Sequence, residues 1–106
     1  MRVRLDGTFL QVNRRFCEWL DFKSEDLVER RRLQDLLTVG GRIFYQTHWS
    51  PLLQMQGSLA EVKLEIVTSK GERIPVVMNA VRTAIDGDFV VDVALFVARD
   101  RDAYER

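Results

Sequence analysis

Apolar and polar positions follow two different periods along this chain. Between Gly41 and Gly57 the apolar side chains recur every three or four residues, as expected for a helix with one buried side. From Val62 onward apolar and polar side chains alternate, as expected for β-strands. We therefore predict one long helix followed by a part of the chain that is rich in strands.

The predicted long helix carries one apolar stripe. At the helical spacing, four side chains share that stripe: Phe44, His48, Leu52 and Met55. The rings of Tyr45 and Trp49 lie beside it. Pro51 has no N–H to bond back to the preceding turn, so we expect the helix to bend there or to restart with Ser50 as its cap. A bent helix over a sheet would leave a gap for a small ligand, whereas a stripe that only fills the core would leave none.

Three strands are predicted after this helix, separated by two turns. The turns are 69–72, where Gly71 can take a positive φ, and 86–88. Pro75 should lie near the start of the middle strand or at a sheet edge, where its missing N–H does no harm. Alternation gives this strand an inner face that consists of Ile74, Val76, Met78 and Ala80.

The chain opens with a predicted hairpin. Two strand-like runs, at 3–5 and 8–12, flank Asp6-Gly7, which is a strong hairpin signal. Asn13 follows and can cap a short helix, in which Phe16, Trp19 and Leu20 recur at helical spacing.

Two more helical segments are predicted before the long helix. Ser24 is the expected N-cap of the first, which runs to about Arg31, and the second lies at 33–37. The glycines Gly40 and Gly41 are expected to break the chain before the long helix begins. We expect the charged tail at 99–106 to start a connecting helix.

Composition limits the number of domains, the kinds of partner and the compartment that we expect. The 106 residues suit one domain, and 46% hydrophobic residues are enough for a core. Sixteen basic residues balance sixteen acidic ones, which argues against nucleic acid or an anionic membrane as partner. The single cysteine, Cys17, excludes an intrachain disulfide and fits a reducing compartment, so the cytoplasm is expected. No apolar run is long enough for a signal peptide or a membrane span.

Two motifs in this order resemble the PAS domain family. Residues 5–13 match its Asp-Gly strand pair followed by Asn, and residues 70–76 match its Asp-Gly-x-x-x-Pro hairpin, with Lys70 in place of the acidic residue. The resemblance covers almost the whole chain. It implies an α+β fold with a five-stranded antiparallel sheet in the order 2-1-5-4-3, helices packed on one face, and a cavity between the sheet and the long helix. It also implies a PAS-like sensor domain at 1–98.

The resemblance further implies a sensory or dimerisation module of a larger signalling protein, such as a histidine kinase, diguanylate cyclase, phosphatase or transcription regulator. A homodimer and a covalently linked output domain are the expected partners. An enzyme is not expected, because Cys17 and His48 are the only nucleophile and base pair and no motif accompanies them. One Cys and one His are also too few for a zinc site.

Neither established cofactor of similar domains is favoured. Flavin-binding members that form an adduct carry an Asn-Cys-Arg motif just before the long helix, where this chain reads Thr-Val-Gly-Gly-Arg at 38–42. Haem-binding members supply a histidine from the long helix, but that ligand would fall near Gln56, about two turns after His48. The ligand therefore stays unknown, and a small organic molecule is the expected class.

Two functional hypotheses remain open. For a small-molecule sensor, the candidate ligand-binding residues are Trp19, Phe44, Tyr45, His48, Trp49, Leu52, Met55, Val76 and Met78. For a module that only associates, alternation places an apolar surface on the sheet face away from the helices. The candidate interface residues there are Val77, Val81, Val90 and Phe96, with Val67 and Pro75 beside them. Both could hold, with a ligand altering the strands and thereby the tail.

Overall fold

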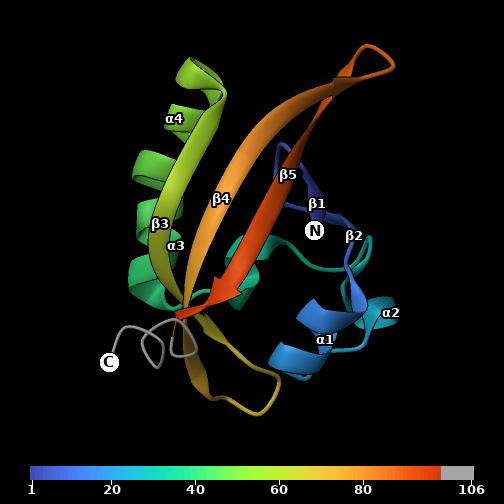
Figure 1. Cartoon of the computed structure of the whole chain (residues 1–106), viewed down its shortest axis with the longest axis vertical. Coiled ribbons are helices and arrows are strands. Elements are labelled where there is room, and N and C mark those ends of the chain that lie inside the picture. The colour runs from blue at the N-terminus through green and yellow to red at the C-terminus, as the bar shows by residue number, and fades with distance from the viewer. Residues whose placement is uncertain (99–106) are drawn as a thin grey trace.

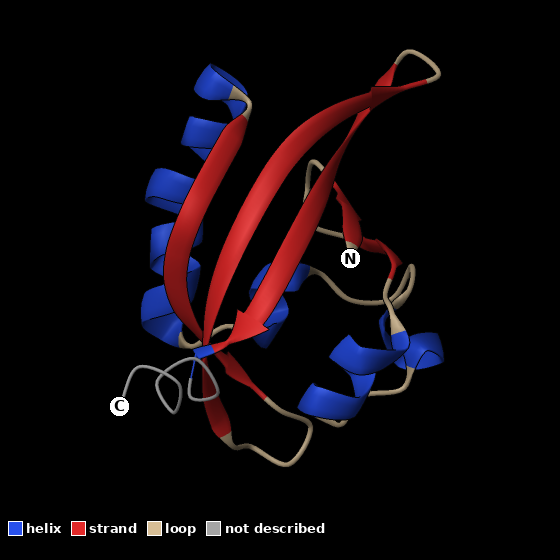
Figure 2. Cartoon of the chain, viewed as in Figure 1, coloured by secondary structure: helices blue, strands red, loops and turns tan. Residues whose placement is uncertain are grey.

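The computed structural model describes residues 1–98 and shows a sheet with helices packed on one of its faces (Figures 1 and 2). Within this range the strands pair in the order β2-β1-β5-β4-β3, as the resemblance implied. The elements are β1 (Arg2–Arg4), β2 (Phe9–Gln11), α1 (Arg14–Leu20), α2 (Ser24–Leu27), η1 (Leu33–Leu36), α3 (Val39–Phe44), η2 (Tyr45–Trp49), α4 (Ser50–Gln56), β3 (Ser58–Val67), β4 (Arg73–Ile85) and β5 (Asp88–Val97). The predicted connecting helix at 99–106 lies outside the described residues.

The opening hairpin and its cap are as predicted. Arg4 and Thr8 close the turn, and Gly7 has a φ of +95°. A Cβ on Gly7 would lie 2.0 Å from Gln34 Oε1, so only glycine lets η1 approach this turn. Asn13 then caps α1, because its Oδ1 accepts a 2.8 Å hydrogen bond from the Phe16 amide.

The second short helix differs from the prediction. It spans only Ser24–Leu27, and Ser24 is its first helical residue and not its cap. It ends early because Glu29 has a φ of +61° and its amide donates to the Phe9 carbonyl at 2.8 Å. The Arg31 carbonyl in turn accepts from the Phe9 amide. Residues 29–31 thus cover the outer edge of β2.

The long helix runs without a break from Val39 to Gln56 through α3, η2 and α4. Thr38 caps it, with Oγ1 accepting from the Gly41 amide at 3.2 Å, so the two glycines lie in its first turn and do not break the chain. The predicted cap at Ser50 is also wrong, since this residue is helical (φ −63°, ψ −48°). Its amide bonds back to the Tyr45 carbonyl in a π-turn, which leads the chain into Pro51 without ending the helix.

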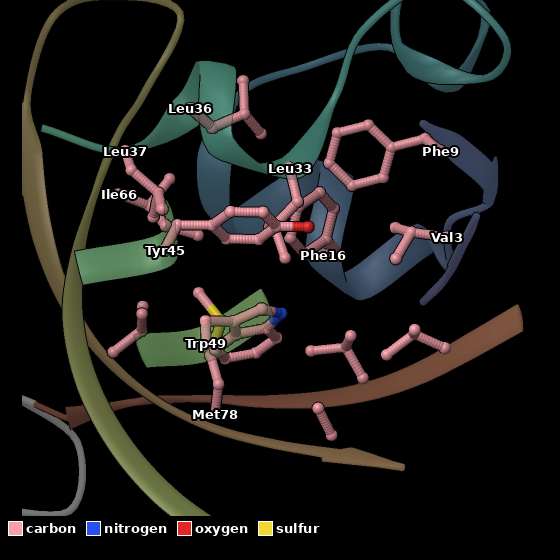
Figure 3. Packing of buried hydrophobic residues seen from close by; sticks show 14 of the residues in the cluster. Val3, Phe9, Phe16, Leu33, Leu36, Leu37, Tyr45, Trp49, Ile66 and Met78 are labelled. Atoms are coloured by element: carbon pink, nitrogen blue, oxygen red, sulfur yellow. The ribbon is translucent and has the colours of Figure 1, made fainter. Parts of the chain in front are cut away.

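The buried side of this helix is one residue away from the predicted stripe. Its buried residues are Gly41, Tyr45, Trp49 and Leu53. Met55 is 83% exposed, and His48 is exposed as well. The two stripes share the same spacing, and the stacked rings of Tyr45 and Trp49 (centroids 5.7 Å apart) remove more apolar area from water than Phe44 paired with a polar histidine. Figure 3 shows both rings inside the core.

The three C-terminal strands form the predicted meander. Asp86 and Gly87 both have positive φ, as a two-residue hairpin turn of type I′ requires. Pro75 lies near the start of β4, one residue before pairing with β5 begins at Val76 and Val97. The predicted inner face of β4 is buried. The register places opposite it an outer face that includes Val77, Val81, Val90, Ala94 and Phe96.

Candidate functional site

Around Tyr45 and Trp49, the space between the sheet and the long helix is filled by side chains. Trp49 is 1% exposed and Met78 is 0% exposed, and Figure 3 shows both side chains in the same buried core. Beside Tyr45, Trp49 and Leu53 lies a cavity of about 20 Å³. This volume suits about one water molecule and no organic ligand. The gap that we expected at the bend of the helix is therefore closed, because the aromatic stripe fills it.

A larger groove lies where the long helix begins. It has a volume of about 710 Å³ and is lined by Thr38, Gly40, Gly41, Phe44, Glu61, Lys63, Leu64, Glu65, Pro75, Val76, Val77 and Ala98. The lining therefore combines the first turns of the helix with the edge strand β3 and the start of β4. Of the candidate ligand-binding residues, this groove brings together Phe44 and Val76. The signal for it in the sequence is the Gly40-Gly41 pair, which carries no side chains to fill the space.

The candidate ligand-binding residues Trp19, His48, Leu52 and Met55 do not share a site. His48 lies on the exposed side of the helix, with its ring stacked on Phe44 (centroids 5.0 Å apart) and Nδ1 2.7 Å from Thr47 Oγ1. It does not face the core, so the expected orientation of His48 is wrong. Leu52 is half-buried on the same helix, next to the exposed Met55. Trp19 lies on α1 and lines a separate groove of about 260 Å³ with Phe96.

The outer face of the sheet carries two exposed apolar side chains, which are separated along the strands by the Asn79–Ala94 pair. Phe96 is 54% exposed and Val81 is 51% exposed, while Val90 is half-buried. Val77 is only 4% exposed, and the register places it between Lys63 and Phe96. The predicted interface residues thus do lie on one face, although Val77 is already covered.

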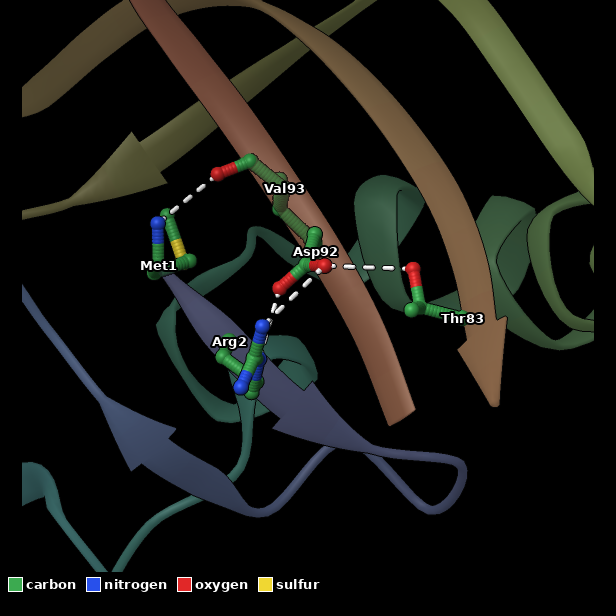
Figure 4. Close-up of polar contacts among 5 residues, drawn as sticks. All are labelled: Met1, Arg2, Thr83, Asp92 and Val93. Atoms are coloured by element: carbon green, nitrogen blue, oxygen red, sulfur yellow. Dashed lines mark hydrogen bonds and ion pairs between the residues drawn. The ribbon is translucent and has the colours of Figure 1, made fainter. Parts of the chain in front are cut away.

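A polar network also lies on this face, beside Val81. The Arg2 guanidinium contacts Asp92 with its Nε 2.8 Å from Oδ1, and the Thr83 hydroxyl donates to Asp92 Oδ2 at 3.1 Å (Figure 4). The hydrogen bond from Arg2 lowers the pKa of the Asp92 carboxyl. This network ties β1, β5 and β4 together, and Asp92 lies directly across the ladder from Val81.

Comparison with known proteins finds no matching family model. Solved structures give clear matches: a PAS domain from a two-component sensor histidine kinase has a TM-score of 0.77 at 17% identity, covering 91% of this chain and 80% of that one. A PAS domain from Desulfitobacterium hafniense has a TM-score of 0.75 at 13% identity, covering 92% and 89%. The PAS-B domain of Drosophila melanogaster Cycle with bound ethylene glycol has a TM-score of 0.73 at 9% identity, covering 90% and 96%. The chain has the PAS fold.

A curated relative adds a match in sequence. Phosphoserine phosphatase RsbP from Bacillus subtilis is 29% identical over 100 residues, which are 94% of this chain. The PAS-fold chain spans 25% of the length of that relative. Within residues 1–98, no helix is long and apolar enough to cross a membrane.

The chemistry-bearing residues of this PAS-fold chain are dispersed. Cys17 lies half-buried on α1, and burial raises the pKa of its thiol, which disfavours the reactive thiolate. His48 lies on another element, the π-turn of the long helix. In the part of the chain that the structure describes, no group of three or more His, Cys, Asp or Glu residues is placed to hold a metal ion.

Proposed function

We propose that this PAS-fold chain is a non-catalytic regulatory module of a larger signalling protein, and that it acts by self-association through the outer face of its sheet. Its structural relatives include a domain of a sensor histidine kinase. Its sequence relative is a phosphatase, and this chain spans 25% of the length of that protein. Both relatives support a linked output domain in the larger protein. The observation that carries the proposal is the exposure of two apolar side chains on the outer face, Val81 and Phe96.

The contrast between the two faces of the sheet favours association over ligand binding in the core. The inner face is closed around the middle of β4, since Met78 and Ala80 are each 0% exposed. The outer face leaves about half of the Phe96 and Val81 side chains in water, on a chain with 30% charged residues. Exposed large apolar side chains that share one face of a sheet are candidates for an interaction site. A second copy that presents the same face would bury both side chains on both partners in an isologous contact.

Glutamate substitutions on the outer face test this proposal. We expect Phe96→Glu and Val81→Glu each to raise the dimer dissociation constant by about tenfold or more, because a carboxylate would be removed from water in the contact. Met55→Glu is the matched control, since Met55 is an exposed apolar residue on the helix. Sedimentation equilibrium gives the dissociation constants. Val77 is unsuitable for this test, because a charge at a 4% exposed position would unfold the chain.

The result that contradicts the proposal is equally defined. A wild-type chain that sediments as a monomer at high concentration would reject self-association. A dimer that weakens with Met55→Glu and persists with Phe96→Glu would place the contact on the helix. Circular dichroism melts of all variants verify that each one is folded.

A small ligand at the start of the long helix is a second candidate function. The groove of about 710 Å³ supports it, because this groove lies between the helix and strands β3 and β4 and includes Phe44 and Val76. The aromatic ring and the flanking charges of Glu61, Lys63 and Glu65 suit a molecule with an apolar body and polar ends.

Filling the groove tests this second candidate. Gly40 lines the groove, and a Cβ there would meet no atom within 4 Å, so Gly40→Phe adds a ring at the groove wall without a clash at its Cβ. We expect Gly40→Phe to lose a small molecule that co-purifies with the wild-type chain, whereas Gly40→Ala should retain it. A molecule that is retained by both variants would bind elsewhere.

A further inference from the structure

The long helix carries a second stripe, which points to solvent. The buried residues of this helix recur every fourth position, at 41, 45, 49 and 53. A residue two positions before or after a buried one lies on the opposite side, because each residue turns a helix by about 100°. The stripe opposite the core, which we call the solvent stripe, consists of Val39, Ile43, Thr47, Pro51 and Met55.

The solvent stripe is apolar and exposed. Its members Met55 (83% exposed), Val39 (70%) and Ile43 (57%) are the three most exposed large apolar side chains that the structure describes. The exposed Thr47 lies between them, and its hydroxyl is occupied within the helix, because Oγ1 donates to the Ile43 carbonyl at 2.8 Å. Thr47 therefore adds a small side chain that needs no polar partner from outside.

Charged side chains are absent from the stretch that holds most of this stripe. Residues 43–60 contain no Asp, Glu, Lys or Arg, although 30% of the chain is charged. Depletion of charged residues is the compositional mark of the centre of a protein interface. A charge on a partner would lose water here without meeting an opposite charge. The surface that is complementary to the solvent stripe is therefore apolar and uncharged.

The shape of the solvent stripe fits an α-helix. Side chains four residues apart form a ridge, and such a ridge packs into the groove between the ridges of a second helix. The small Thr47 lies in the middle of the ridge, where two crossing helices come closest. A second copy of this chain is disfavoured, because the proposed dimer already uses the other side of the molecule. Two-fold contacts on both sides would join the copies into an open array.

We propose that the solvent stripe is a docking site for an amphipathic helix of a partner protein. The apolar side of that helix carries large aliphatic residues at every fourth position and no charge, and it packs across Ile43, Thr47 and Met55. The stripe from Ile43 to Met55 is about 18 Å long, so the bound helix needs roughly three turns or more.

A synthetic helix of this chemistry tests the proposal. The probe is the acetylated and amidated peptide Gln-Glu-Ala-Leu-Gln-Lys-Ala-Leu, repeated twice, which has leucine at every fourth position and supporting Glu–Lys pairs on the far side. The control peptide has glutamine in place of each leucine. In an NMR titration of the 106-residue chain, we expect the leucine probe to shift the signals of Ile43, Thr47 and Met55, and the glutamine peptide to shift none of them.

Two variants of the helix complete the test. We expect Ile43→Glu to raise the dissociation constant of the leucine probe by about tenfold or more, because a carboxylate would be buried against leucine. The matched control is Gln46→Glu, which adds the same charge at an exposed position of the same helix outside the stripe and should leave the dissociation constant within about twofold. Circular dichroism verifies that both variants are folded, and Thr47→Glu replaces Ile43→Glu if that variant is not.

Four results would overturn the proposal. The first is a leucine probe that shifts no signal of the chain. The second is a set of shifts confined to the groove at Gly40 and Val76 or to the outer face at Val81 and Phe96. The third is equal weakening by Ile43→Glu and Gln46→Glu. The fourth is a dimer of the wild-type chain that Ile43→Glu dissociates, which would assign the stripe to a second copy. Loss of the outer-face dimer alone would leave the proposal standing, since the probe also binds a monomer.

Discussion

Tyr45 shows how one side chain couples the core to the opening hairpin. Its ring is buried in the stacked pair with Trp49, and its hydroxyl lies near the Asp6-Gly7 turn. Burial is the main reason that the pKa of Tyr45 is raised to about 12, and the negative charge of Asp6 adds to this effect. The neutral phenol is therefore the form that the folded chain accommodates.

The raised pKa predicts a loss of stability in alkali. In the unfolded chain a tyrosine ionises near pH 10, so between about pH 10 and pH 12 the unfolded state releases a proton that the folded state retains. The free energy of unfolding should accordingly be constant with respect to this group below pH 10 and then fall by about 1.4 kcal/mol per pH unit. Urea unfolding of the wild-type chain and of Tyr45→Phe measures it.

The phenylalanine variant is the decisive comparison, because other groups also titrate in this range. The difference in free energy between the two proteins should shift in favour of Tyr45→Phe as the pH rises above about 10. A difference that stays constant from neutral pH to about pH 11 would show that the Tyr45 hydroxyl reaches water in the folded chain.

At the level of elements, the long helix shows what a single sequence can and cannot give. Its existence and extent follow from the apolar spacing, and so do the hairpins at Asp6-Gly7 and Asp86-Gly87. The choice between the stripes of Phe44 and Tyr45 does not, because two stripes offset by one residue have the same period. Which stripe is buried depends on how well the volumes of its side chains fill the space against the sheet. The π-turn that precedes Pro51 likewise could not be predicted, because no pattern in the local sequence indicates it.

Alanine substitutions at Leu53 and Met55 test the corrected orientation of the helix. Leu53 is 5% exposed and Met55 is 83% exposed. We expect Leu53→Ala to lower the free energy of unfolding by about 2–5 kcal/mol, because it leaves a cavity under the helix. Met55→Ala should change it by no more than about 0.5 kcal/mol. Chemical denaturation measures both, and a larger effect at Met55 would restore the predicted stripe.

How the edges of the sheet are protected could not be predicted from the sequence either. The edge of β2 is covered by residues 29–31, and the bulge at Glu61, whose amide donates to Asn79 Oδ1 at 2.7 Å, bends the edge strand β3. These contacts join residues far apart in the chain, so no local pattern predicts them. Strand order and the outward face could be predicted, because alternation and the family resemblance both bear on them.

At the level of the whole molecule, the core around Tyr45 and Trp49 is closed, so binding sites are to be sought at the surface. The interior that the sequence suggested as a ligand pocket is occupied by Tyr45, Trp49 and Met78. The accessible features that bear on function include the exposed side chains of Val81 and Phe96 on the outer face and the groove at the start of the long helix.

Native mass spectrometry of the purified chain tests the central claim most directly, because one spectrum gives both the number of subunits and the mass of any bound molecule. We expect a dimer whose mass equals twice that of the 106-residue chain, and a shift to the monomer with Phe96→Glu but not with Met55→Glu. A monomer that carries a small molecule, with no dimer at any concentration, would contradict the account.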